Sequence, residues 1–215
     1  MRIEIWCDII CPYCGLAEWR LENVLAAFEH RAETQVIHRS FQLHPDLDRS
    51  GVARRDLLVM RVSNPAEVEK TILRPLEQTA EREGLTPYRA IERTLGSTDH
   101  VHELLANASD TGLQAEAWNR MFHAHFGEAR KLWTLDQVAD FAAELGLDPA
   151  EARAVLVKPK VPRAGRDRPT RGAAAGRGRH TIMLIARKYP VSGAKTTAQL
   201  LSALRRVWQD QYQAQ

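Results

Sequence analysis

Apolar and polar residues alternate at the start of the chain and then recur at helical spacing. Over residues 2–9 every second side chain is apolar, a period of two that predicts a strand. After Pro12, apolar residues return every three or four positions as far as Phe28, which predicts a helix with one apolar face. Residues 34–43 form a second strand candidate, β-branched in its first half. The order strand, helix, strand favours a right-handed parallel β-α-β unit.

Residues 52–156 carry mostly helical signals. Asn64 precedes a proline and a glutamate, Thr134 opens a capping box with Gln137, and Asp148 precedes a further helical start. Pro75 falls inside the helical pattern that follows Asn64 and should kink or split that helix. We see no internal repeat, so this part of the chain is predicted to be a block of separate helices.

The end of the chain returns to strands. Residues 182–186 and 189–193 are separated by Arg187 and Lys188 and predict a β-hairpin, and an amphipathic helix follows up to Trp208. Removing the helical block leaves β-α-β followed by β-β-α, the order of a thioredoxin fold. We therefore predict an α/β thioredoxin fold with a large all-helical insertion. Residues 1–51 and 157–215 would form the thioredoxin-like domain and residues 52–156 the insertion.

Bulk composition defines the class of protein but not its chemistry. The 215 residues, 44% hydrophobic and 27% charged, are ordinary for a soluble globular protein. Glu4 and Asp8 interrupt the apolar residues at the start, so we expect no secretory signal. No window approaches the roughly 18 uninterrupted apolar residues that a membrane span needs. These features predict a cytoplasmic protein with no membrane partner.

The net charge of +3 comes from one stretch. Eight of the 30 Lys and Arg residues but one of the 27 Asp and Glu residues lie in 157–181, which leaves 22 basic and 26 acidic residues elsewhere. The stretch interleaves no aromatic residue for stacking on bases, so we do not expect a nucleic-acid partner. A solvated loop fits its Pro, Gly and Arg content. Our preferred hypothesis is a pair of compensating frame shifts in a GC-rich gene, which resequencing would test.

All three cysteines lie within residues 7–14. An odd number of thiols in a reducing compartment is not a stabilising disulfide framework and indicates redox chemistry or a metal. Cys11 and Cys14 form a CxxC at the predicted helix start, where residues three apart face the same side and the sulfurs can meet. The helix N-terminus favours a thiolate and can lower the pKa of Cys11. Cys11 is then the nucleophile, and Cys14 is placed to resolve the mixed disulfide.

A metal site is the main alternative at this motif. Zinc needs four ligands, and only Cys7 remains besides the pair. His100 and His102 are two residues apart, as are His123 and His125, so on helices they point in different directions, and we interpret them as surface or packing residues. Cys7 shares the parity of the core-facing isoleucines, so we interpret it as a buried small hydrophobe.

The segments "IEIWCDIICPYCGLAEWRLE", "RSFQLHPDL" and "KYPVSGAKTTAQLLSALRRVW" resemble the DsbA family of thiol-disulfide oxidoreductases, specifically its FrnE-like cytoplasmic branch. The likeness covers nearly the whole chain, and Trp6 and Asp8 before the cysteines make it specific. The resemblance implies a thioredoxin fold, Cys11 as nucleophile, Cys14 as resolving thiol, and Pro12 and Tyr13 as supporting residues between them. It implies no cofactor and no metal, and a disulfide-bearing protein or small-molecule thiol as substrate.

The chain departs from the family pattern at two positions. Cys7 stands where this branch usually has serine. Thr181 stands where the family carries a cis-proline against the CxxC, and because a cis bond before threonine costs about 2.5–4 kcal/mol, we expect a trans bond and an altered substrate groove. Two alternatives stay open: a metal-binding or redox-sensing module using the three thiols, and a glutathione-dependent isomerase of the hydroxychromene carboxylate type, a group that usually lacks a CxxC.

Overall fold

The computed structural model describes residues 1–157 and 182–213. Two interpretations of the sequence therefore lie outside the described residues: the origin of the basic stretch from 158 onward, and the bond and groove at Thr181.

The chain opens with the expected β-α-β unit. Strand β1 (Arg2–Cys7) leads into helix α1 (Pro12–Ala27), and a 3-10 turn (Arg31–Glu33) precedes strand β2 (Gln35–Ser40). The two strands are parallel, in register from Arg2 opposite Gln35 to Cys7 opposite Ser40. The predicted first strand and helix are confirmed, and the second strand ends three residues before the predicted boundary.

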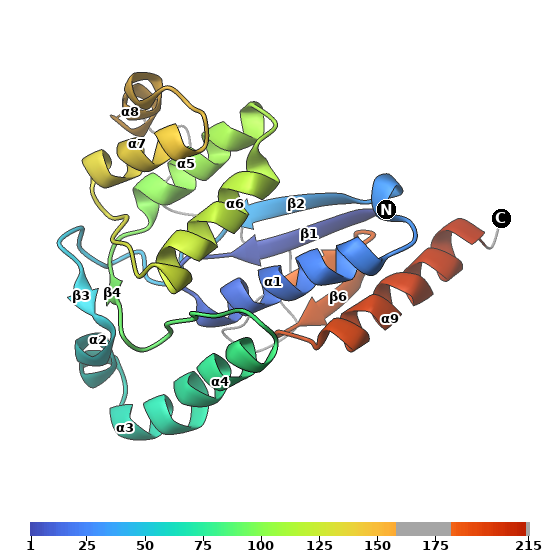
Figure 1. Ribbon diagram of the computed structural model, residues 1–215, viewed down its shortest axis with the longest axis horizontal. Helices are drawn as coiled ribbons and strands as arrows, with labels where there is room; N and C mark the ends of the chain where they lie inside the picture. Colours follow the sequence, from blue (N-terminus) through green and yellow to red (C-terminus); the bar gives the residue numbers. More distant parts are fainter. Residues whose placement is uncertain (158–181, 214–215) are drawn as a thin grey trace.

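The end of the chain adds a hairpin and a helix. Strands β5 (Ile182–Ile185) and β6 (Tyr189–Ser192) are antiparallel, and β5 also pairs antiparallel with β1, which gives the sheet order β2-β1-β5-β6. Ala186 and Arg187 have φ of 49° and 57°, the left-handed backbone that a tight hairpin turn needs at both central positions. Helix α9 (Thr197–Trp208) runs alongside α1 (Figure 1), and a π-helical turn (Gln209–Gln213) follows it. This sheet and its helices form a thioredoxin fold.

Between β2 and residue 157 most of the regular secondary structure is helical. Its elements are β3 (Val52–Ala53), α2 (Arg54–Arg61), α3 (Pro65–Val68), a π turn (Glu69–Leu73), α4 (Arg74–Arg82), β4 (Thr94–Leu95), α5 (Asp99–Asp110), α6 (Gln114–Phe122), a second π turn (His123–Gly127), α7 (Leu135–Glu144) and α8 (Pro149–Val157). The expectation of an all-helical insertion needs one correction, because the two-residue strands β3 and β4 pair antiparallel.

Local signals place the ends of these helices. The Asn64 side chain accepts a hydrogen bond from the Glu67 N–H at 3.1 Å and caps α3. Thr134 and Gln137 form the expected capping box of α7. Pro75 lies in the first turn of α4, directly after the π turn. The predicted interruption of this helix is confirmed, because proline cannot donate the backbone bond that would continue an α-helix there.

Buried side chains of the sheet and of the helical block belong to one continuous hydrophobic cluster. Ile3 and Ile5 of β1 are fully buried, and so are Trp118 and Phe141 of the helices. The boundaries at 51/52 and 156/157, which would separate two domains, stay a prediction.

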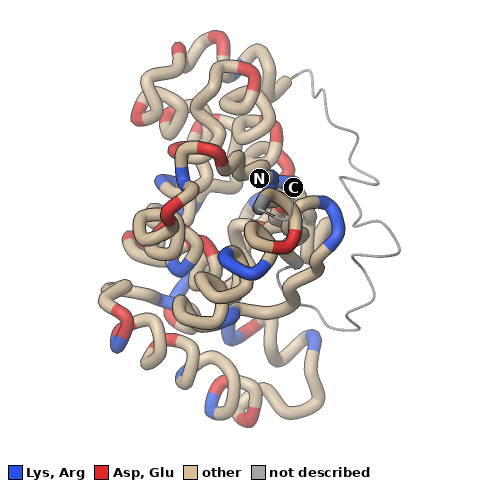
Figure 2. Tube along the Cα trace, turned by 90° about the vertical axis from the view of Figure 1, so that its right-hand side faces the viewer, with Lys and Arg blue, Asp and Glu red and all other residues tan. Residues whose placement is uncertain are grey.

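Arg20 of α1 ties distant segments together. Its guanidinium donates to both carboxylate oxygens of Glu83, at 2.7 and 2.5 Å, and to the carbonyl of Ala194. Acidic and basic residues are interspersed over the part of the chain drawn in Figure 2. Within the described ranges, no helix combines the length and apolar character needed to cross a bilayer.

Candidate active site

Cys11 ends the turn between β1 and α1, and Cys14 lies in the first turn of α1. Cys11 is the N-cap of α1, with extended backbone (φ −80°, ψ 113°), and its carbonyl accepts hydrogen bonds from the N–H groups of Cys14 and Gly15 at 3.0 and 3.3 Å. Its own N–H donates to the Asp8 carbonyl at 3.1 Å. The predicted position of the pair, at the N-terminus of a helix that follows a strand, is confirmed.

All three cysteines are free thiols and all are buried. Cys11 is 5% exposed, Cys14 is 3% exposed and Cys7 is fully buried. The Cys14 side chain is hydrogen-bonded to both Cys11 and Cys7, so the three thiols lie in contact through Cys14. Cys7 faces the core as predicted, and it also contacts the pair.

The environment of Cys11 and Cys7 disfavours the ionisation of their thiols. The hydrogen bond between the Cys11 and Cys14 side chains and the burial of the site raise the pKa of Cys11 well above its ordinary value. A hydrogen bond from the Cys14 backbone N–H acts in the opposite direction and is outweighed. Burial also raises the pKa of Cys7. The expectation of a lowered Cys11 pKa was therefore wrong for the dithiol form, because it considered the helix terminus without the burial.

Pro12 and Tyr13 occupy the two positions between the cysteines. Pro12 is the first residue of α1, as predicted, and its carbonyl accepts a hydrogen bond from the buried hydroxyl of Tyr88. Tyr13 is half-buried, and burial raises the pKa of its phenol. The turn is thus held from outside by a residue 76 positions further along the chain.

Trp6 and Asp8 support the approach to the turn. Asp8 is 1% exposed, and its Oδ2 accepts a hydrogen bond from the Leu43 N–H at 2.6 Å. Its Oδ1 lies 3.3 Å from Nε2 of the fully buried His102, an ion-pair distance. Asp8 thereby links the end of β1 to the segment after β2 and to α5. Trp6 is 8% exposed and lies opposite Arg39 of β2 in the sheet.

Two arginines near the turn had no signal in the sequence. Arg93 is 7% exposed, its Nη2 donates to the Ile10 carbonyl at 2.8 Å, and its Cζ lies 4.1 Å from the ring centroid of Phe126. Arg54 follows β3, and its backbone N–H donates to the Arg93 carbonyl at 2.9 Å. Both come from the helical block, at least 40 residues after the cysteines, so spacing along the chain could not place them at the site.

A second buried ionic contact lies one turn below Cys14. Nε2 of His38 is 2.9 Å from both carboxylate oxygens of Glu18, and the His38 ring stacks on Trp118 with centroids 5.3 Å apart. Of the histidine pairs considered in the sequence, His102 and His125 are fully buried whereas His123 is exposed. The different directions predicted for His123 and His125 are therefore confirmed.

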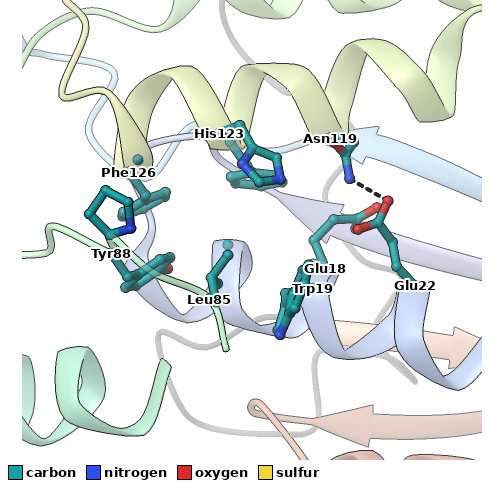
Figure 3. A pocket seen from close by; sticks show the side chains of 12 residues that line it. Glu18, Trp19, Glu22, Leu85, Tyr88, Asn119, His123 and Phe126 are labelled. Carbon is teal, nitrogen blue, oxygen red and sulfur yellow. Dashed lines mark hydrogen bonds between the residues drawn. The ribbon is translucent and has the colours of Figure 1, made fainter. Parts of the chain in front are cut away.

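A shallow pocket, open to solvent, lies between α1 and the helical block (Figure 3). Tyr88 and Phe126 stack at one end of it, with ring centroids 4.6 Å apart, and Glu22 is hydrogen-bonded to Asn119 at the other. Gly15 forms part of its wall, but neither Cys11 nor Cys14 lines it. Burial raises the pKa of Glu22 there.

Across residues 1–157 and 182–213, no group of three or more His, Cys, Asp or Glu side chains is arranged to hold a metal ion. Cys7, Cys11 and Cys14 lie within that range, so the proposed three-thiol metal site receives no support from their arrangement.

A four-stranded sheet of this order, with a cysteine pair at the start of its first helix, defines a thioredoxin-fold protein. The family model described as a DSBA-like thioredoxin domain matches residues 2–204, and the chain belongs to that family. A search of curated proteins found no match. Membership of the FrnE-like branch stays a prediction.

Solved structures agree with this assignment. The crystal structure of a probable DsbA oxidoreductase from Streptomyces coelicolor is 30% identical, with a TM-score of 0.81, and the match covers 97% of this chain and 90% of that one. A 2-hydroxychromene-2-carboxylate isomerase is 16% identical over the whole of both chains, with a TM-score of 0.69. The cytosolic disulfide reductase DsbM from Pseudomonas aeruginosa with GSH is 17% identical over 99% of this chain and 100% of that one, with a TM-score of 0.58. The last two show likeness of fold alone.

Proposed function

We propose that this protein is a thiol-disulfide oxidoreductase that exchanges disulfides through Cys11 and Cys14. The observation that carries the proposal is the hydrogen-bonded pair of thiols at the N-terminus of α1, in a chain of the DsbA-like family. The thiolate is the nucleophile in such exchange, so the first step is deprotonation of Cys11.

The proposed cycle moves two electrons and two protons. The Cys11 thiolate attacks one sulfur of a substrate disulfide, whose S–S bond breaks as a mixed disulfide forms, and the leaving sulfur takes a proton. Cys14 then loses its proton and attacks Cys11, which releases the second substrate sulfur as a thiol. The substrate is reduced to two thiols and the enzyme is oxidised to the Cys11–Cys14 disulfide. The reverse sequence would oxidise a dithiol.

Reduction is the direction we propose. A dithiol oxidase is strongly oxidising when its reduced form, with the nucleophilic cysteine as a thiolate, is stabilised. In this protein the hydrogen bond to Cys14 and burial raise the pKa of Cys11 and so destabilise its thiolate. A reducing cytoplasm fits this direction, and one neighbour in fold is a cytosolic disulfide reductase with GSH. The substrate would be a disulfide-bearing protein or small-molecule disulfide, and a thiol such as glutathione would regenerate the enzyme.

The test is reduction of insulin disulfides with glutathione as the electron source. The unmodified protein should turn over, Cys11→Ser should abolish turnover, and Cys14→Ser should accumulate a mixed disulfide at Cys11. Cys7→Ser is the matched control, since it removes a neighbouring buried thiol and should keep turnover. Equal activity in the protein and in Cys11→Ser would refute the proposal.

The isomerase alternative makes the opposite prediction for Cys14. A glutathione-dependent isomerase needs no resolving thiol, so Cys14→Ser would keep full activity on 2-hydroxychromene-2-carboxylate. Support for the isomerase alternative comes from the shared fold. Turnover of 2-hydroxychromene-2-carboxylate that does not depend on Cys14 would favour an isomerase over an oxidoreductase.

We propose that Thr181 affects the rate at which the enzyme reduces its substrate. Family resemblance assigns Thr181 to the place of the cis-proline that exposes backbone to substrate. Thr181→Pro should therefore raise insulin reduction while leaving the pH dependence of Cys11 alkylation unchanged. An unchanged rate would show that position 181 does not limit substrate binding.

A further inference from the structure

Two arginines, Arg93 and Arg54, lie close to the active-site turn. Arg93 is held between the ring of Phe126 and the carbonyl of Ile10, the residue directly before Cys11. Figure 3 shows Phe126 and Tyr88 together beside the first turns of α1, and the Tyr88 hydroxyl is bonded to the residue directly after Cys11. The arginine is therefore anchored to the same short turn as the nucleophile.

The guanidinium of Arg93 lacks a carboxylate partner among the described residues. Its Nε and Nη1 are buried without a hydrogen-bond partner, and so is Nε of the neighbouring Arg54. Glu77 is the acidic residue that acts on Arg93 electrostatically, and its Oε1 already accepts from the N–H groups of Ala90 and Ile91. A buried charge without a partner is costly, so a function for this one has to be sought.

Burial and the neighbouring titratable groups shift the pKa of Arg93. Burial, followed by the charge of Arg54, lowers the pKa of Arg93 to about 9, and the negative forms of Tyr88, Cys11 and Glu77 act in the opposite direction. Burial also lowers the pKa of Arg54, and the negative form of Cys11 is the group that opposes it. Among the described residues, Cys11 in its thiolate form is the group named as stabilising the charge of both arginines.

Electrostatic coupling is reciprocal, so a thiolate that stabilises the two guanidinium charges is stabilised by them to the same extent. The other titratable groups that act on Cys11 work against its ionisation: Cys14 in α1 through its side chain, and Asp8 at the end of β1. Tyr13 and Tyr88 carry no charge near neutral pH. The arginines are therefore the cationic side chains available to offset burial at the nucleophile.

We propose that Arg93, with Arg54 beside it, forms a fixed positive site behind the turn that stabilises the thiolate of Cys11. Arg93 is a positioning residue in this assignment, because it acts through Cys11. The assignment rests on the proposed role of Cys11 as nucleophile, and it adds that the helical block supplies positive charge that offsets part of the effect of burial on this thiol.

The experiment measures the rate of iodoacetamide alkylation at Cys11 between about pH 6.5 and 8.5, located by mass spectrometry of the peptide, where the rate follows the thiolate fraction. Arg93→Met should lower this rate about tenfold at each pH, the effect of about one pKa unit from a lost opposite charge. Arg54→Gln should lower it less, and Arg93→Lys should keep most of it. Arg20→Met is the matched control: it removes a buried, fully partnered arginine from α1 and should leave the Cys11 rate unchanged.

Superimposable pH profiles for the unmodified protein, Arg93→Met and Arg54→Gln would overturn the proposal, and so would an equal shift in Arg20→Met. If circular dichroism shows that Arg93→Met does not fold, the result for Arg54→Gln decides, because Arg54 is partly exposed and lies outside the hydrophobic core. The alkylation rate needs no turnover. A protein with the predicted shifts but no insulin reduction would therefore refute the proposed function and leave this assignment standing.

Discussion

Gly15, directly after the second cysteine, packs closely against Tyr88 and Phe126. A Cβ atom at this position would lie 2.6 Å from the Tyr88 hydroxyl and 2.9 and 3.0 Å from two ring carbons of Phe126. The same hydroxyl donates to the carbonyl of Pro12 and so holds the turn that carries the cysteines. Gly15→Ala therefore tests whether the helical block is packed against the active-site turn as closely as the structure describes.

The expected magnitude follows from three effects. Alanine gains about 1 kcal/mol over glycine in a helix interior. Overpacking a rigid site costs about 1–3 kcal/mol. Displacing Tyr88 leaves the buried Pro12 carbonyl without its hydrogen-bond donor, at a cost of about 1–3 kcal/mol. The sum predicts that Gly15→Ala lowers the free energy of unfolding by about 1–5 kcal/mol, and the melting temperature by about 2–4 °C per kcal/mol in a chain of this size.

Urea unfolding of Gly15→Ala, Tyr88→Phe and the double variant provides the assay. Because the shortest contact is to the hydroxyl, Tyr88→Phe should relieve part of the strain, and the double variant should cost at least about 0.5–1 kcal/mol less than the two single changes added together. Additive costs, or a Gly15→Ala protein as stable as the unmodified one, would refute the close packing.

Two further predictions concern buried histidines. Burial and the charge of Arg93 hold the pKa of His125 well below its ordinary value, so its ring is neutral when folded and takes up a proton on unfolding below about pH 6.5. Stability should therefore fall as the pH falls below that point, by up to about 1.4 kcal/mol per pH unit, and His125→Gln should flatten the slope measured by urea unfolding between about pH 6.5 and 5. Burial also lowers the pKa of His44, which should account for the slope that remains; an unchanged slope would contradict the assignment to His125. His38→Leu should cost about 3–5 kcal/mol because it leaves the Glu18 carboxylate buried without its partner, and Glu18→Gln in that background should recover part of the loss.

The sequence predicts the scaffold of the site because the relevant signals are local. The period of two in β1, the apolar stripe of α1 and the capping box at Thr134 are each set by residues within a few positions of one another. The cysteine pair is equally local, and its place at the helix start follows from Pro12. Strands β3 and β4 could not be predicted in this way because a strand of two residues is too short to show a period.

The surroundings of the cysteines are set by tertiary contacts, and this part of the site could not be predicted. Tyr88 and Arg93 reach the turn from more than 70 residues away, and neither belongs to a motif. The expectation of a low Cys11 pKa failed in part for the same reason: the hydrogen bond to Cys14 is local, but the burial that also raises this pKa depends on the tertiary packing around the turn. Gly15, next to the CxxC, is the residue whose small size could have indicated a close neighbour.

The central claim is that Cys11 and Cys14 are one reversible redox pair. The measurement that tests it most directly is equilibration of the full chain in glutathione redox buffers, followed by acid quenching, alkylation of free thiols and mass spectrometry of the peptides. The account predicts one two-electron transition in which Cys11 and Cys14 lose their alkylation together while Cys7 stays alkylated, and no such transition in Cys11→Ser. Independent oxidation of the two cysteines, or a disulfide that includes Cys7 in place of either, would contradict it.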